Sequence, residues 1–138
     1  MSAPPIDKLS LVVFSGDFSR IDYALRLASA AAAVNIPATL FFTMKACQVL
    51  RQPGMNGPPN WADMQGGGMT CGVADGIATF EEVLTAAVAL GVRFIVCETG
   101  LRAVGLIPAD LRSDIPIEVA GMVTFLADSS RDGSIVFI

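Results

Sequence analysis

The sequence predicts an α/β fold in which a mostly parallel sheet of about five strands carries helices on both faces. Two observations predict it. Short apolar runs rich in β-branched residues, typical of buried strands, recur along the chain. Segments with helical spacing of apolar residues and with helix-start signals lie between these runs. An alternation of strand and helix is typical of a parallel sheet, because parallel neighbours need a crossover connection.

Five apolar runs are expected to form the strands. They are short, and Gly, Pro or polar residues bound them. Several are apolar at successive positions, as strands buried on both faces are. In chain order they are residues 9–15 (LSLVVFS), 38–43 (ATLFFT), 92–97 (VRFIVC), 115–121 (IPIEVAG) and 134–138 (SIVFI).

Helical segments are expected between the strands. The two longest begin with residues spaced as in a capping box, Ser19 with Asp22 and Thr79 with Glu82, and Gly91 closes the second helix. The expected segments are residues 21–34, 44–51, 79–90, 101–104, 108–111 and 122–130.

The alternation breaks at about residues 52–76. This segment is dense in Gly and Pro and contains three Met residues and Trp61. So long an irregular segment is usually a functional loop, a subunit contact or a mobile region. A hydrophobic lid and a subunit interface would each account for its Met and Trp side chains. With no internal repeat and no linker, we expect one domain over residues 1–138 with this segment as an insert.

Composition narrows the functional classes. Hydrophobic residues make up 53% of the chain and charged residues only 16%, so we expect other subunits of a homo-oligomer to cover some apolar surface. The net charge is −4 and the nine Lys and Arg residues are scattered, so nucleic acid is not an expected partner.

The sequence predicts neither a membrane span nor a secretory signal. Its longest apolar stretch, residues 25–42, is interrupted by Arg26, Asn35 and Pro37. The beginning of the sequence, MSAPPIDKLS, lacks a positive start followed by an apolar core. We therefore expect a cytoplasmic location.

Candidate chemistry lies where the predicted strands end, because sites in open parallel sheets form at the carboxyl ends of the strands. Three segments lie there, residues 15–17, 43–47 and 97–100. Besides Cys97, the candidate pocket residues in them are Ser15, Thr43, Cys47, Glu98, Thr99 and Gly100.

Cys97 is the candidate with the most chemical capability. A thiol between a strand and a helical turn can have its thiolate stabilised by backbone N–H groups, which makes the sulfur nucleophilic. Glu98 would oppose that effect unless its side chain points away. The alternative interpretation is that Cys97 is a small apolar residue finishing a buried strand.

The residue types that are missing restrict the chemistry. The chain has no histidine, which excludes Ser-His-Asp and Cys-His hydrolase mechanisms and metal sites that use histidine. The three cysteines contain no C-x-x-C pair, so no metal site is expected. Cys71, in the insert, could approach Cys97 as a second thiol or be an incidental loop residue. Cys47 is expected to be packed on a helix, although it stays a candidate pocket residue.

Four segments of the chain resemble the DsrE/F-like sulfur carriers. They are KLSLVVFSGD, ATLFFT, LGVRFIVCETGLRAVGL and IEVAGMVTFLADS, which together cover most of the chain outside the insert. The resemblance implies a three-layer α/β/α domain, commonly assembled as a trimer or hexamer. It also implies that the strand-end cysteine, here Cys97, carries sulfane sulfur as a persulfide without a cofactor. Cys71 is the position to test for the second cysteine that assists in some members.

The leading hypothesis is therefore a cytoplasmic sulfur carrier or sulfurtransferase that passes sulfur from a donor protein to an acceptor protein. The role would lie in sulfur oxidation or a sulfur relay. Two alternatives remain open. Cys97 could be inert packing in a non-catalytic subunit of a homo-oligomer, or the protein could be a redox sensor that forms a disulfide between Cys71 and Cys97.

Overall fold

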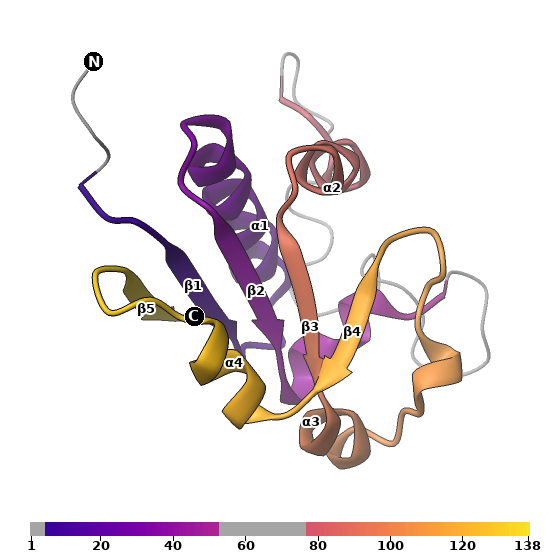
Figure 1. The fold of residues 1–138 in the computed structure, drawn as a ribbon. Helices are drawn as coiled ribbons and strands as arrows, with labels where there is room; N and C mark the ends of the chain where they lie inside the picture. Colours follow the sequence, from indigo (N-terminus) through magenta and orange to yellow (C-terminus); the bar gives the residue numbers. More distant parts are fainter. Residues whose placement is uncertain (1–4, 53–76) are drawn as a thin grey trace.

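The computed structural model describes residues 5–52 and 77–138, and a five-stranded sheet lies at its centre (Figure 1). Every neighbouring pair of strands is parallel, and the order across the sheet is β4-β3-β2-β1-β5. The predicted α/β fold is confirmed, with a sheet that is parallel throughout. In chain order the strands are β1 Leu9–Val13, β2 Ala38–Phe42, β3 Arg93–Cys97, β4 Ile117–Ala120 and β5 Ser134–Phe137.

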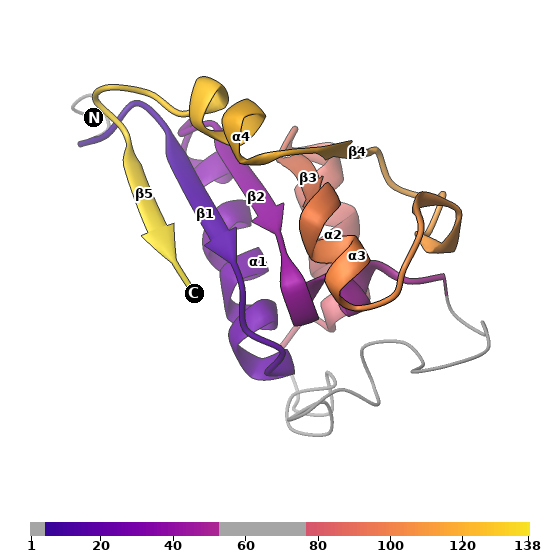
Figure 2. The same ribbon diagram turned by 90° about the horizontal axis from the view of Figure 1, so that it is seen from below.

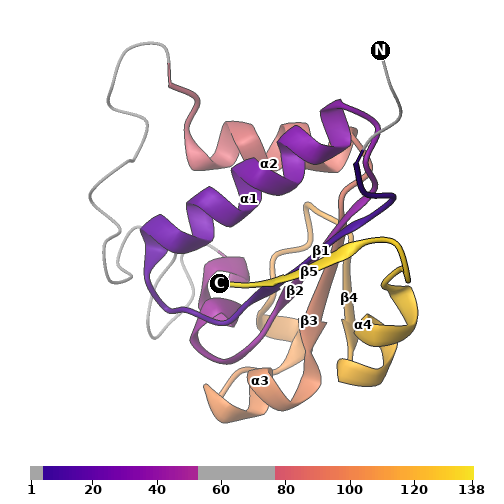
Figure 3. The same cartoon turned by 90° about the vertical axis from the view of Figure 1, so that its left-hand side faces the viewer.

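Helices lie on both faces of the sheet, so the fold has three layers. The helices are α1 Phe18–Ala33, the 3-10 helix η1 Met44–Leu50, α2 Phe80–Ala89, α3 Glu98–Ala103, the 3-10 helix η3 Pro108–Asp110 and α4 Met122–Asp128. Figure 3 shows α1 and α2 together on one face and α4 on the other. Figure 2 views the sheet from the end where β1, β2 and β3 terminate, with α3 directly after β3.

The start of α1 differs from the prediction. Its N-cap is Asp17, whose Oδ1 accepts a hydrogen bond from the Ser19 amide at 2.9 Å. Asp22 lies in the helix, where its Oδ2 accepts a hydrogen bond from Arg26 Nε at 3.0 Å. The predicted capping box at Ser19 is therefore wrong. The carboxylate of Asp17 comes first along the chain and accepts a hydrogen bond from a free amide of the first turn.

The start of α2 matches the prediction. Thr79 Oγ1 accepts a hydrogen bond from the Glu82 amide at 3.2 Å, and Glu82 Oε1 accepts one from the Thr79 amide at 2.8 Å. The helix ends before Gly91, whose φ of +85° lies in the left-handed region that favours glycine. This capping box is confirmed because both partners lie in the local sequence and need no tertiary contact.

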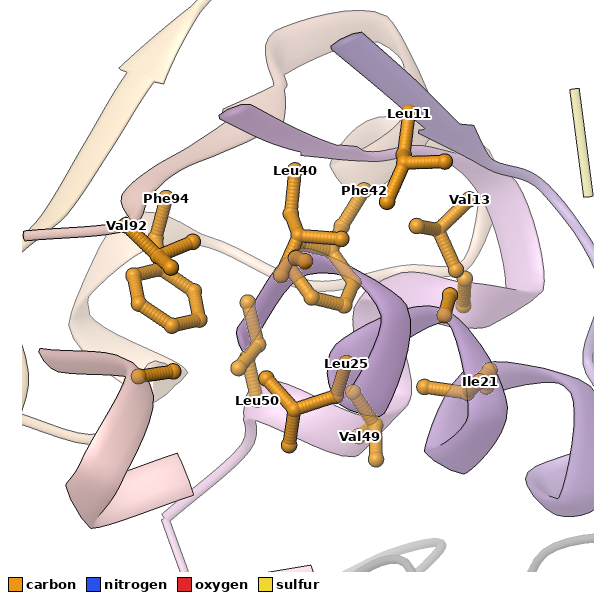
Figure 4. Close-up of a cluster of buried hydrophobic side chains, with 14 of the residues drawn as sticks. Leu11, Val13, Ile21, Leu25, Leu40, Phe42, Val49, Leu50, Val92 and Phe94 are labelled. Atoms are coloured by element: carbon orange, nitrogen blue, oxygen red, sulfur yellow. The ribbon is translucent and has the colours of Figure 1, made fainter. Parts of the chain in front are cut away.

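Two separate apolar clusters lie on the two faces of the sheet. The main core fills the space between the sheet and the helices α1 and α2, and Figure 4 shows Leu40, Phe42 and Phe94 pointing into it. Side chains alternate along each strand, so Phe41 and Ile95 point the other way. They join a small cluster under α4 whose buried members are Phe41, Ile95, Cys97 and Phe125.

Candidate functional site

Cys97 is the last residue of β3 and the residue immediately before α3. It pairs in register with Ala120 of β4, and only 2% of its surface is exposed. The strand-end position that the sequence predicts for this thiol is therefore confirmed. No capping hydrogen bond joins the Cys97 side chain to the first turn of α3, so helix amides do not hold the sulfur in the way the sequence suggested.

Cys97 lines a hollow of about 470 Å³ on the α4 face of the sheet. We call it the apolar hollow, because its lining side chains carry no charge and only two of them bear a hydroxyl group. The lining residues are Val12, Phe14, Phe41, Thr43, Met44, Cys97, Thr99, Met122, Phe125, Leu126, Ile135 and Phe137.

Aromatic contacts hold two walls of the apolar hollow. The rings of Phe41 and Phe125 stack with centroids 4.8 Å apart, which holds α4 against the sheet. The rings of Phe14 and Phe137 lie 5.4 Å apart at the side where β1 and β5 end. Phe41 and Phe125 are buried, whereas Phe14 and Phe137 are exposed. The hollow thus has a packed floor around the thiol and an open apolar rim.

The chain makes a tight approach where η1 meets α3. Met44 has a φ of +53°, a left-handed conformation that costs a side chain such as Met about 1–2 kcal/mol. A Cβ added to Gly100 would lie 2.5 Å from the Met44 amide nitrogen and 2.7 Å from Thr43 Oγ1. Only glycine at position 100 lets α3 pack this closely against the end of β2. The strained turn places Thr43 and Met44 in the lining of the apolar hollow.

The structure brings together some of the predicted pocket residues and separates others. Thr43, Cys97 and Thr99 share the apolar hollow. Gly100 is buried behind it, against the turn at Thr43, and Glu98 is exposed and is not a lining residue. Of the three residues that follow Cys97 in the sequence, the placement of α3 therefore brings only Thr99 into the lining of the hollow.

Ser15 lies in a second hollow next to the first. This neighbouring hollow of about 860 Å³ contains three charged side chains, Asp17, Arg20 and Lys45. Ser15 Oγ accepts a hydrogen bond from the Asp17 amide at 3.0 Å, so its hydroxyl caps the turn before α1. Phe14, Met44 and Phe137 line both hollows and form the boundary between them. Ser15 and Cys97 therefore line different hollows.

Cys47 points into the main core, on the opposite face from Cys97. Its Sγ lies 3.7 Å from the carbonyl oxygen of Phe42, to which the thiol donates. Burial, and to a lesser extent electrostatic repulsion from Cys97, raises the pKa of the Cys47 thiol to about 12. Cys47 is therefore a packed, protonated thiol at neutral pH, as the first of its two interpretations expected.

Asp128, at the end of α4, ties this helix to the sheet. Its carboxylate lies 2.7 Å from Lys8 Nζ and 2.5 Å from the Arg93 guanidinium, and it accepts a hydrogen bond from Thr39 Oγ1 at 2.6 Å. Burial alone would raise the pKa of this carboxyl, but the three hydrogen-bond donors outweigh it and hold the pKa below its usual range. These partners lie at the start of β1, β2 and β3. The helix α4 is therefore anchored at the end of the sheet where the strands begin, and Cys97 lies at the opposite end, where they terminate.

Sequence reasoning missed most of the lining of the apolar hollow. Met122, Phe125 and Leu126 come from α4, and Ile135 and Phe137 from β5. A signal for them exists in the sequence. The segments MVTFLAD and SIVFI carry more apolar residues than a short surface helix and an edge strand need for one buried face each.

Cys71 and the rest of residues 53–76 lie outside the described residues. Within residues 5–52 and 77–138, no group of three or more His, Cys, Asp or Glu residues is placed to hold a metal ion. No helix in the same described ranges is both long and apolar enough to cross a membrane.

Comparisons with known proteins agree with this fold. The sequence model of the DsrE/DsrF-like family matches residues 7–133. The solved structure of a protein of unknown function, MTH1491 from Methanobacterium thermoautotrophicum, is similar, with a TM-score of 0.59 and 14% sequence identity. The similarity covers 95% of this chain and 98% of that one, and at this identity it shows the fold alone. No curated protein sequence matches the chain significantly.

Proposed function

We propose that this chain, which belongs to the DsrE/DsrF-like family, is a sulfur carrier that holds sulfane sulfur as a persulfide on Cys97. Family membership indicates a role related to sulfur relay and confirms the resemblance read from the sequence. The observation that carries the finer proposal is the position of Cys97, at the carboxyl end of β3 with its side chain in the apolar hollow. The other described cysteine, Cys47, lies in the opposite core.

The proposed transfer is a pair of displacements at sulfur. The Cys97 thiolate attacks the terminal sulfur of a donor persulfide, a new S–S bond forms to Sγ, and the donor leaves as a thiolate with the electron pair of the broken bond. An acceptor thiolate then attacks the same terminal sulfur, and Sγ leaves as the thiolate. Each step exchanges one S–S bond for another, so the pair needs no oxidant, metal or organic cofactor.

The surroundings of Cys97 suit such a carrier. With only 2% of the residue exposed, a bound persulfide would be shielded from water and from passing reductants. Thr43 and Thr99 supply the hydroxyl groups of the lining, and we assign them as hydrogen-bond donors to the terminal sulfur. Gly100 acts through packing, since it allows α3 to approach this turn. Donor and acceptor proteins would approach at the open rim of the hollow.

A homo-oligomer is part of the proposal. Large apolar side chains of α1 are exposed, among them Tyr23 and Leu27. Apolar surface of this kind is commonly covered in an assembly. The mass of the protein in solution, measured by sedimentation, tests it, and a monomer across micromolar concentrations would contradict it.

A non-catalytic subunit is the second candidate function. The observation that favours it is the burial of Cys97 among Phe41, Ile95 and Phe125, which is also the environment of an inert packed cysteine. The two candidates differ in one respect that can be measured, the ability of Cys97 to take up sulfur.

Intact mass spectrometry after brief exposure of the reduced protein to inorganic polysulfide tests the proposal. We expect a gain of whole sulfur atoms that a reductant reverses. The gain should disappear in Cys97→Ser and persist in Cys47→Ser, the matched control from the opposite face. A Cys71→Ser variant shows whether that thiol takes part. Absence of any gain in the wild-type protein would favour the non-catalytic subunit.

A further inference from the structure

The apolar hollow differs from its neighbour in charge. Its lining carries no charged side chain, and its polar side chains other than Cys97 are Thr43 and Thr99. The neighbouring hollow holds the cations Arg20 and Lys45, on the other side of the shared boundary. An anion that enters the apolar hollow would therefore leave water without meeting a cation in the lining.

The charge of a sulfur compound determines the free energy that it costs to bring the compound from water to the thiol. Moving an ion into apolar surroundings costs several kcal/mol unless a partner compensates, whereas an uncharged compound meets no such penalty. Sulfur atoms are polarizable and make favourable contacts with aromatic rings and thioethers. Phe41, Phe125 and Met44 present these groups around Cys97. A volume of about 470 Å³ lies within the range of small-molecule sites.

We propose that the apolar hollow is a binding site for an uncharged sulfur donor, a ring or chain of sulfur atoms without an ionised group, which loads Cys97 directly. The inference rests on the proposed function and names the substrate class of the same thiol. When the Cys97 thiolate attacks one sulfur of a neutral ring, a bond forms to Sγ and one S–S bond of the ring breaks. The ring becomes a chain on Cys97 that ends in a sulfur anion, so electrons balance without a further reagent.

The first arm of the test measures charge selection without sulfur transfer. In a Cys47→Ser, Cys71→Ser background, Cys97 is treated with a neutral aromatic disulfide, dithiodipyridine, and with the dianionic dithiobis(nitrobenzoate). Each rate is divided by the rate of free cysteine with the same reagent. We expect the neutral reagent to be favoured by at least about tenfold, the equivalent of roughly 1.4 kcal/mol of charge-burial penalty. Equal normalised rates would overturn the inference.

The second arm uses sulfur donors. Loading of Cys97 by elemental sulfur and by thiosulfate is followed by intact mass, again relative to a free thiol, and elemental sulfur should be favoured by a similar factor. If polysulfide loads Cys97 but elemental sulfur is not favoured over thiosulfate, the inference is overturned and the proposed function still stands. Failure of every donor to load Cys97 would overturn both.

A matched pair of variants locates the selection in the hollow. Met122 and Val123 are adjacent in the first turn of α4 and are 62% and 81% exposed, but only Met122 lines the hollow. A glutamate suits either position on the helix, so both variants should fold. Met122→Glu should lower the neutral-reagent rate about fivefold or more by adding a charge at the rim, and Val123→Glu should leave it unchanged.

A second copy of the chain is the rival occupant of this face. If it covers the hollow, both reagents will react slowly with Cys97, and Met122→Glu will lower the molecular mass in solution and raise both rates. That result would overturn the inference.

Discussion

The two faces of the sheet give their cysteines different surroundings. Cys47 lies in the broad core beneath α1 and α2, where it donates to the Phe42 carbonyl and its pKa is raised to about 12. Cys97 lies under α4, in a cluster of four buried residues that opens into the apolar hollow. A long helix pair seals one face and a seven-residue helix only partly covers the other. Access to a thiol in this fold is therefore set by which layer lies above it.

The largest expected difference between the two faces is in packing. Phe94→Ala removes a fully buried ring from the main core and should lower the free energy of unfolding by about 3–5 kcal/mol. Phe125→Ala should cost less, about 2–3 kcal/mol, because the residues around it border a hollow and can relax into it. Urea unfolding of the two variants measures both values. Equal losses would mean that α4 seals its face as tightly as α1 seals the other.

The next difference is in pH dependence. Because the pKa of Cys47 is about 12 in the folded state and near 9 when unfolded, the folded state keeps its proton longer. Its stabilising effect is complete below pH 9 and is lost as the pH rises towards 12, at about 1.4 kcal/mol per pH unit. Between pH 8 and pH 10.5 the wild type should lose about 2 kcal/mol more stability than Cys47→Ala.

Denaturant melts of both proteins at these two pH values measure the difference. Identical pH slopes would show that the Cys47 thiol is more accessible to water than the structure indicates. Cys97→Ala, measured in parallel, removes the smaller cause of the raised Cys47 pKa and should therefore change the pH slope less than Cys47→Ala does.

The smallest expected effect concerns the anchor of α4. Asp128→Asn removes the charge that pairs with Lys8 and Arg93 and should lower stability by about 1–2 kcal/mol. Glu118→Gln removes only a surface partner of Arg93 and should change stability by less than about 0.5 kcal/mol. Because Asp128→Asn loosens α4, Cys97 should also react faster with the neutral disulfide in this variant. Glu118→Gln, the control, should leave that rate unchanged.

The anchor carries its own pH dependence, of opposite sign to that of Cys47. The lowered pKa of Asp128 means that its contribution is present above the usual carboxyl range and is lost as the pH falls through the folded value. Asp128→Asn should therefore flatten the fall in stability below about pH 4. An unchanged acid limb, together with unchanged Cys97 reactivity, would show that the Phe41–Phe125 stack alone holds α4.

Local signals in the sequence were enough for the element order, the parallel sheet and the position of Cys97 at a strand end. The capping box of Thr79 and Glu82 and the alternation of Phe41 and Phe42 act between residues close in the chain, so they can be read directly. The start of α1 differs from the prediction because Asp17, two residues before Ser19, caps the first turn with its carboxylate.

The surroundings of Cys97 could not be read in the same way. The apolar hollow combines residues of β1, β2, β5 and α4, and its outermost members in sequence, Val12 and Phe137, are 125 positions apart. The anchor at Asp128 joins the start of the sheet to the end of α4. Cys47 is separated from the hollow because its side chain lies in the core on the other face of the sheet, and Ser15 is separated from Cys97 because it lines the neighbouring hollow. Sequence patterns record periodicity and caps because these are local, whereas the lining of a cavity depends on contacts that exist only when the layers pack.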